Sequence, residues 1–176
     1  GQGYRHPYHA HLQLLDVDMT GMPAGRRGEG VEKGFFSGKR NRRGRQLGRV
    51  VATQYNEVVI DRLYRGKRQM ERSLQELVIA AEDVLELDEY RRKRTIVRVD
   101  GGGGRDADVN WLLGRGYHVV VKNKNWKRAN MLAASVSKWH VDPKTGDPFV
   151  TGFFTSSFLD GAYGVSPGKI LAKAIC

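Results

Sequence analysis

Cysteine is nearly absent from this chain of 176 residues, because the only one is Cys176 at the last position. A single thiol excludes an internal disulfide and a metal site made of several thiolates. Such sparing use of cysteine is typical of proteins in a reducing compartment. We therefore expect a cytoplasmic protein.

Long apolar runs are missing as well. No run approaches the roughly 20 residues that cross a bilayer, and residues 1–7 contain no apolar segment of a signal peptide. Hydrophobic residues make up 40% of the chain and charged residues 28%. This composition is typical of one soluble domain with a real core and predicts no membrane partner.

Acidic residues are few compared with basic ones, 19 against 30, which gives a net charge of +11. Such an excess favours a polyanionic partner. An anionic membrane surface is the alternative, but it usually requires a basic amphipathic helix. The helix expected at 69–92 carries charges of both signs, so nucleic acid is the favoured partner.

The excess of positive charge is concentrated in residues 21–49, where nine cations stand against Glu29 and Glu32. Phe35 and Phe36 lie in the middle, and eight glycines are expected to keep the backbone pliable. Cations interleaved with aromatics predict contact with a nucleic-acid backbone and stacking on bases. A solvated loop is the alternative. The cations are Arg26, Arg27, Lys33, Lys39, Arg40, Arg42, Arg43, Arg45 and Arg49.

Two stretches end in a carboxylate that is followed by turn residues. The β-branched run 94–100 ends at Asp100, and four glycines follow it; the run 12–18 ends at Asp18, with a turn expected at 19–23. Side chains alternate with a period of two along a strand, so Asp16 and Asp18 share one face. We expect both runs to be strands of one sheet.

Alternating apolar residues at 47–54 and 57–63 predict an antiparallel hairpin. An apolar stripe then predicts one helix over 69–92, formed by Met70, Leu74, Leu77, Val78, Ala81 and Leu85. After Asp100 the sequence predicts a short helix that Asp106 or Asp108 caps and a strand at 117–121. Residues 122–139 are expected to be helical, and 142–148 to form a turn.

This order (three antiparallel strands, helix, strand, helix, strand) predicts an α/β fold with a mixed sheet and helices on its faces. The order is that of ribonuclease H-like folds, in which the first and fourth strands are neighbours. Asp18 and Asp100 would then meet. Two close carboxylates repel each other unless a cation lies between them, and oxygen ligands favour Mg²⁺ or Mn²⁺.

Several of these motifs together resemble the DDE transposases of bacterial insertion sequences, over roughly residues 4–145. The resemblance implies a ribonuclease H-like catalytic domain that cuts and rejoins double-stranded DNA at transposon ends with two Mg²⁺ ions, as a homodimer when complete. By position, Asp18 matches the first catalytic Asp and Asp100 the second. The motifs are Asp16 to Thr20, Gly34 to Gln46, Gly44 to Arg49, Arg98 to Gly102 and Asn110 to Leu113.

The chain departs from the family pattern in one respect, because the family has a catalytic Glu downstream of the second Asp and no Glu follows Asp100 here. Residues 149–176 also carry few charges and differ in composition from the rest. We therefore expect residues 1–148 to be a partial catalytic domain and residues 149–176 an atypical tail, with a frameshifted or a substituted end as the two alternatives. A truncated transposase of this kind would be inactive alone.

The expected metal ligands are Asp18 and Asp100, with Asp16 as the substitute for Asp18. Trp126 either stacks on a base or packs in the core. Contacts to phosphate are expected from Arg40, Arg42, Arg43, Arg45, Lys122, Lys124, Lys127 and Arg128, for which a solvated surface is the alternative.

Two other functions remain open from the sequence. A non-catalytic module that binds nucleic acid would use the basic segment and ignore the carboxylates. A dinucleotide-binding enzyme would use the glycines at 101–104, but its fingerprint needs a glycine at position 106, where Asp106 stands.

Overall fold

A mixed sheet of six strands forms the centre of this α/β fold, and helices add a second layer. The computed structural model describes residues 12–36, 38–99, 105–121, 140–141, 143–144 and 148–149. The strands are β1 (Gln13–Pro23), β2 (Glu32–Phe36), β3 (Lys39–Ala52), β4 (Glu57–Tyr64), β5 (Thr95–Val99), β6 (His118–Val121), β7 (His140–Val141) and β8 (Pro148–Phe149). The helices are α1 (Leu74–Leu85), α2 (Glu89–Arg92) and α3 (Asp106–Gly114), with 3₁₀ turns η1 (Thr53–Tyr55) and η2 (Met70–Arg72).

The strand order explains how distant parts of the chain meet. The sheet runs β2-β3-β1-β5-β6, and β4 also pairs with β3. The β1, β3 and β4 strands are antiparallel, whereas β5 is parallel to β1 and β6 is parallel to β5. The predicted hairpin at 47–63 is therefore confirmed, and so is the predicted pairing of the first strand with the strand that follows the long helical stretch.

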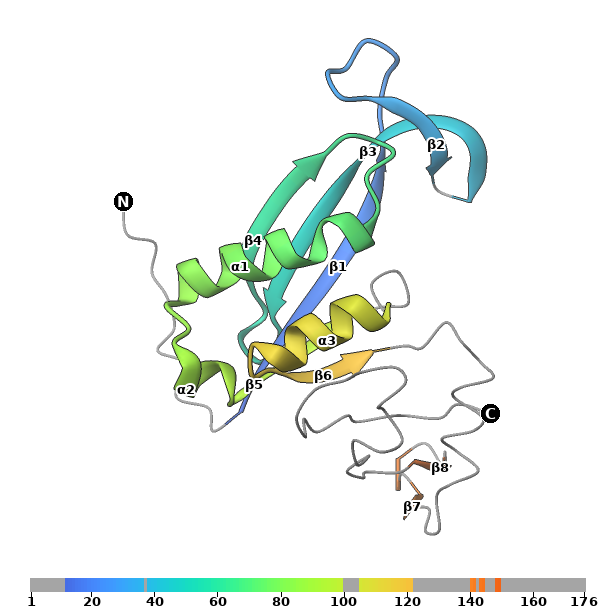
Figure 1. Ribbon diagram of the computed structural model, residues 1–176. Helices are drawn as coiled ribbons and strands as arrows, with labels where there is room; N and C mark the ends of the chain where they lie inside the picture. Colours follow the sequence, from blue (N-terminus) through green and yellow to red (C-terminus); the bar gives the residue numbers. More distant parts are fainter. Residues whose placement is uncertain are drawn as a thin grey trace.

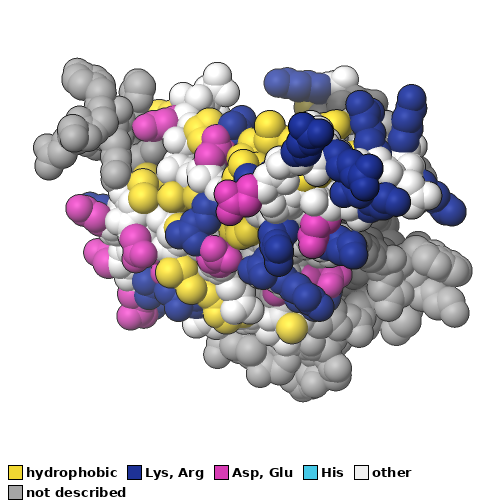
Figure 2. Space-filling view, turned by 90° about the horizontal axis from the view of Figure 1, so that it is seen from above, with side chains coloured by type: hydrophobic (Ala, Val, Ile, Leu, Met, Phe, Trp, Pro, Cys, Tyr) yellow, Lys and Arg dark blue, Asp and Glu magenta, His cyan; other side chains and the backbone are white. Residues whose placement is uncertain are grey.

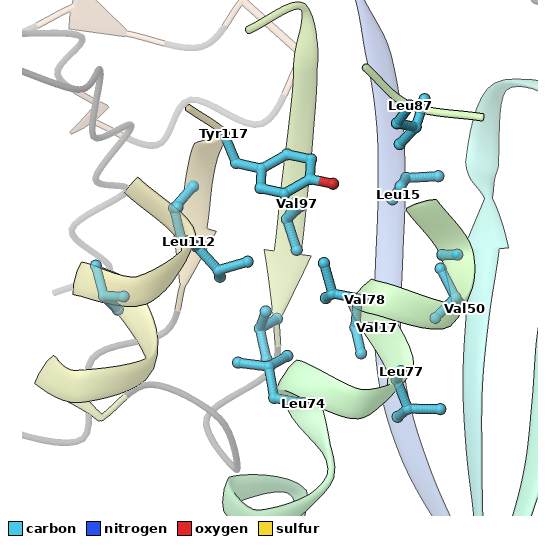
Figure 3. Close-up of a cluster of buried hydrophobic side chains, with 14 of the residues drawn as sticks. Leu15, Val17, Val50, Leu74, Leu77, Val78, Leu87, Val97, Leu112 and Tyr117 are labelled. Atoms are coloured by element: carbon cyan, nitrogen blue, oxygen red, sulfur yellow. The ribbon is translucent and has the colours of Figure 1, made fainter. Parts of the chain in front are cut away.

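The core lies between the sheet and the two longer helices, α1 and α3 (Figure 1). Alternate residues of the strands, such as Leu15 on β1 and Val97 on β5, point toward these helices and are fully buried. Leu74 and Leu77 of α1 and Leu112 of α3 meet them there (Figure 3). Burial of this continuous apolar cluster is the main force that fixes β1 beside β5.

The apolar stripe predicted for the helix is confirmed, because all six of its residues are buried. A single helix over 69–92 is wrong, however. Glu86 adopts a left-handed φ of 54° and ends α1. Asp88 then accepts a hydrogen bond from the backbone N–H of Arg91 and begins α2. A left-handed residue followed by a capping carboxylate divides the helical stretch into two.

The first strand is longer than predicted. The expected turn at 19–23 is wrong, because these residues continue β1 and pair with β3 up to Pro23 opposite Gly44. Pairing along a long partner strand overrides the local turn preference of Gly21 and Pro23.

The predicted capping of the short helix is also wrong. The N-cap of α3 is Arg105, and no side chain caps this end. Asp108 is instead 1% exposed, and its carboxylate accepts a hydrogen bond from the guanidinium of Arg105 at 3.2 Å. Burial raises the pKa of Asp108, and the bond to Arg105 opposes that change.

Within the described residues, α1 and α3 pack on one face of the sheet rather than on both. Alternation along the strands places Asp16, Asp18, Arg49 and Arg98 on the opposite face. The β7 and β8 strands form a separate two-stranded sheet. No helix in the described part of the chain has the length and apolar character that a membrane span requires.

Candidate functional site

The candidate site begins where the pairing between the two central parallel strands ends. β1 and β5 pair in register from Gln13 opposite Thr95 to Val17 opposite Val99. Asp18 is the next residue of β1, and its side chain is exposed. The hydroxyl of Thr20 donates a hydrogen bond to the Asp18 carboxylate at 3.1 Å. Asp100 follows Val99 in the sequence and lies outside the described residues.

Asp16 lies on the same face as Asp18 but is already engaged. Arg98 of β5 is its register partner and donates two hydrogen bonds to its carboxylate. A two-pronged contact between guanidinium and carboxylate is among the stronger kinds of ion pair. The Asp16 carboxylate is therefore held by a cation of the protein itself, whereas that of Asp18 is open to solvent.

Arg49 of β3 lies between two carboxylates of neighbouring strands. It is the register partner of Asp18 on β1 and of Asp61 on β4. Its guanidinium donates hydrogen bonds to Asp61 at 2.6 and 2.7 Å. These bonds lower the pKa of Asp61. Among the described residues, no cation forms an ion pair with Asp18, which leaves its carboxylate available for an external cation.

The oxygen atoms at Asp18 are donors of the type that the expected metal ions prefer. An exposed carboxylate with a hydroxyl beside it is an oxygen donor set of the type that Mg²⁺ and Mn²⁺ prefer. No group of three or more His, Cys, Asp or Glu side chains is assembled among the residues that the structure describes. The predicted ligand Asp100 falls outside that part.

A second feature, which we call the arm, extends the sheet beyond β4. It comprises residues 21–45: the end of β1, all of β2 and the first half of β3. β4 ends opposite Gln46, so the arm projects past the helix-covered body of the sheet (Figure 1). Gly44 pairs with Pro23 on one side and with Glu32 on the other. Farther out, residues 33–43 form a two-stranded ribbon.

Among the described residues, the cations of the arm have no acidic partner, whereas several cations of the body have one. Arg49, Arg62, Arg98 and Arg115 of the body each form an ion pair with a carboxylate. No ion pair within the described residues involves the arm cations, and Figure 2 shows Lys and Arg side chains gathered on this part of the surface. These cations are Arg26, Arg27, Lys33, Lys39, Arg40, Arg42, Arg43 and Arg45.

Phe36 organises the arm from within. Its side chain is 1% exposed. An added Cβ would lie 2.8 Å from its ring at Gly21, 3.0 Å at Gly34 and 2.9 Å at Gly44. These three glycines therefore make room for the ring, whereas an added Cβ at Gly25 or Gly38 would meet nothing within 4 Å. Base stacking by Phe36 is also wrong, because its ring is buried.

The predicted phosphate-binding residues fall into two groups. Arg40, Arg42, Arg43 and Arg45 lie on β3 within the arm, and the Nε of Arg45 donates a long hydrogen bond of 3.5 Å to the carbonyl oxygen of Tyr64. The others lie outside the described residues: Lys122, Lys124, Trp126, Lys127 and Arg128.

Sequence reasoning missed the roles of Arg49 and Arg98 beside the carboxylates. The period-two alternation that placed Asp16 and Asp18 on one face also applies within β5 and β3. Pairing each strand with its neighbour in register would have placed both arginines there. The register itself was the missing information.

Comparison with known proteins gives no match, whether to protein-family models, to curated proteins or to solved structures. The functional conclusion is therefore argued from the geometry and from the residues themselves.

Proposed function

We propose that this chain is part of a metal-dependent DNA transposase with a ribonuclease H-like catalytic domain. Asp18 and Asp100 would hold Mg²⁺ or Mn²⁺ beside the last pair of β1 with β5, and the substrate would be double-stranded DNA at transposon ends. As the resemblance implies, the complete enzyme would act as a homodimer, and we place it in the cytoplasm.

The observation that carries this proposal is the parallel pairing of β1 with β5. The last described pair is Val17 opposite Val99, and each of these residues directly precedes an Asp in the sequence. Register partners of parallel neighbours lie side by side, so continuing this register by one residue would bring the two carboxylates together.

The strand order supports the same fold. Three antiparallel strands, β4, β3 and β1, are followed by β5 and β6, which are each parallel to the preceding neighbour in the order β4-β3-β1-β5-β6. In the chain, α1 lies between β4 and β5, and α3 lies between β5 and β6. This is the order expected from the ribonuclease H-like resemblance.

In the proposed reaction, the residues of the chain would bind the metal ions and orient the DNA. A bound metal pair would activate water or a 3′-hydroxyl and stabilise the leaving oxygen of an in-line displacement. Asp18 would supply a metal ligand that no cation of the described residues neutralises. Arg98 and Arg49 fix the flanking carboxylates of Asp16 and Asp61. No Glu follows Asp100, so the third ligand of the family pattern is not among these residues, and we expect no strand transfer from them alone.

The test is a calorimetric titration with Mn²⁺ on the wild-type chain and on Asp18→Asn and Asp100→Asn. Both substitutions should weaken binding at least tenfold, because each removes a charged ligand. Asp83→Asn is the matched control: Asp83 is an exposed acid on α1 and is remote from the strand ends. Equal affinity in all four proteins would contradict the metal site.

A second candidate function is favoured by the unpaired cations of the arm. A non-catalytic nucleic-acid-binding module would need the arm but neither aspartate. In that case DNA binding would be unchanged by Asp18→Asn and Asp100→Asn, and Mn²⁺ titration of the wild type would show no saturable site.

A further inference from the structure

The outer part of the arm is a small ribbon with charges of one sign only. Residues 33–43 contain five cations, Lys33, Lys39, Arg40, Arg42 and Arg43, and no acid. None of the five forms an ion pair with a described residue, and all except Arg43 are exposed, Arg43 being partly buried. Folding places these like charges on neighbouring strands, with Lys33 opposite Arg43, although like charges at such positions destabilise a sheet. Binding of an external anion would reduce this repulsion.

The ribbon is also held in shape before any partner arrives. Phe36 is buried against the glycines of three strands, and an added Cβ at Gly66 would lie 2.3 Å from the carbonyl oxygen of Gly44. The backbone N–H of Gly66 donates to the carbonyl of Gly30 at 3.1 Å, and that of Lys67 donates to the carboxylate of Glu32 at 2.8 Å. The loop after β4 thus supports the base of the arm, so little ordering would be required on binding.

We propose that this ribbon is a preformed phosphate-binding element that holds the backbone of double-stranded DNA without regard to sequence and without metal. This inference rests on the proposed function and specifies that the ribbon holds the DNA substrate as a duplex. A two-stranded ribbon fits the major groove of B-form DNA, which is about 12 Å wide. Single-strand binding relies on aromatic stacking. Among the described side chains of the ribbon the one aromatic ring is that of Phe36, which is buried and cannot provide it.

The distance along β3 gives the separation between the ribbon and the proposed metal site. Arg43 lies six residues from Arg49, the register partner of Asp18, which is about 20 Å along a strand. At about 3.4 Å per base pair this corresponds to roughly six base pairs of duplex. The ribbon would hold DNA at that interval from the point of reaction.

The experiment measures the affinity for a 20-base-pair duplex of arbitrary sequence in EDTA, over a range of KCl concentrations. For duplex DNA the slope of log K against log salt is about −0.9 for each phosphate neutralised. Replacing Arg40, Arg42 and Arg43 by Gln should make the slope less steep by about 2.7, and at 0.1 M salt it should weaken binding by on the order of 100-fold. The triple Lys variant, which retains the charges, should keep the slope.

Three outcomes would overturn the proposal: an unchanged slope in the Gln variant, tighter binding of single-stranded than of duplex DNA, or displacement of the duplex by polyglutamate as readily as by DNA. Asp83→Asn, which replaces the exposed acid on α1, should bind in the same assay as the wild type does. Failure of the ribbon would leave the Mn²⁺ titration unaffected, and failure of the metal site would leave binding in EDTA unaffected, so the two proposals fail separately.

Discussion

Arg98 of β5 and Asp16 of β1 are register partners joined by two hydrogen bonds across the central parallel pair. The two residues of this pair each lie two positions before an aspartate in the sequence, Asp18 and Asp100. It therefore places one fixed positive charge close to the edge at which we propose metal binding.

Replacement of Arg98 by Gln should strengthen Mn²⁺ binding, because it removes a cation that repels the metal and also frees Asp16. When solvent partly screens such a charge, its removal changes the free energy of Mn²⁺ binding by up to about 1 kcal/mol. This corresponds to roughly two- to fivefold in affinity. Stability should fall by only about 0.5–1 kcal/mol, since the Arg98 side chain is half exposed. Calorimetric titration and urea unfolding measure the two effects.

Arg62→Gln provides the control for that experiment. Arg62 pairs with Glu76 of α1, on the helix-covered face of the sheet. Its replacement removes the same charge from the chain but should leave Mn²⁺ affinity unchanged. Equal gains in both variants would indicate a general charge effect and would contradict the local one.

Gly44→Ala should loosen the arm. Its added Cβ would lie 2.5 Å from the carbonyl oxygen of Met22 and 2.9 Å from the ring of Phe36. Relief of such overlap requires backbone movement and costs about 1–3 kcal/mol. We expect faster tryptic cleavage within residues 26–43, measured by mass spectrometry of timed digests.

Gly25→Ala is the matched control for the arm, because an added Cβ there meets nothing within 4 Å. It should digest at the wild-type rate. If Gly44→Ala were as resistant as Gly25→Ala, the close packing of Phe36 against the glycines would not be what orders the arm.

The elements that the sequence predicted correctly are those in which local pattern and tertiary burial agree. The stripe from Met70 to Leu85 has one apolar face and packs on the sheet with that face. The alternation in 47–63 likewise matches the pairing of β3 with β4. In these segments the period of hydrophobic residues determines both the element and the side that it buries.

The arm could not be predicted in the same way, because its order depends on contacts between distant residues. Phe36 is buried only because Gly21 and Gly44 of other strands leave space for its ring. Composition alone indicates a basic glycine-rich loop there. For the same reason the sequence did not reveal the cross-strand partners of Asp16 and Asp18, because the register between two strands is not a property of either strand alone.

A further prediction concerns Glu82, which is buried on α1 and accepts hydrogen bonds from Arg115 and from the hydroxyl of Tyr117. Burial alone would raise the pKa of Glu82, but the bonds from Arg115 and Tyr117 outweigh it and lower the pKa. Glu82→Gln should cost about 1–3 kcal/mol at pH 7. This loss of stability is smaller than that for a fully buried ion pair, because the side chain of Arg115 is partly exposed.

The pH dependence of that cost follows from the lowered pKa. The ionised Glu82 stabilises the fold above the ordinary glutamate pKa of about 4.3, and this contribution is lost as the pH falls through the lower value of the folded state. The difference in unfolding free energy between wild type and Glu82→Gln should therefore shrink below about pH 4. A difference that stayed constant from pH 7 to pH 3 in urea unfolding would count against the ion pair.

Tyr117 gives the corresponding prediction at alkaline pH. Burial, together with its hydrogen bond to Glu82, raises the pKa of Tyr117 far above its ordinary value. The unfolded chain releases this proton above about pH 10 while the folded chain keeps it, so stability should fall there by up to about 1.4 kcal/mol for each pH unit. Tyr117→Phe should cost about 1 kcal/mol at pH 8 and remove this part of the alkaline decline.

The measurement for Tyr117 is urea unfolding from pH 8 to pH 11. Tyr90→Phe is the control, because Tyr90 is 67% exposed and lies outside the buried core. Its alkaline profile should follow that of the wild type. If Tyr117→Phe declined as steeply as Tyr90→Phe, the proton on Tyr117 would not be retained by the fold, and the hydroxyl would not be the donor that holds Glu82 in the core.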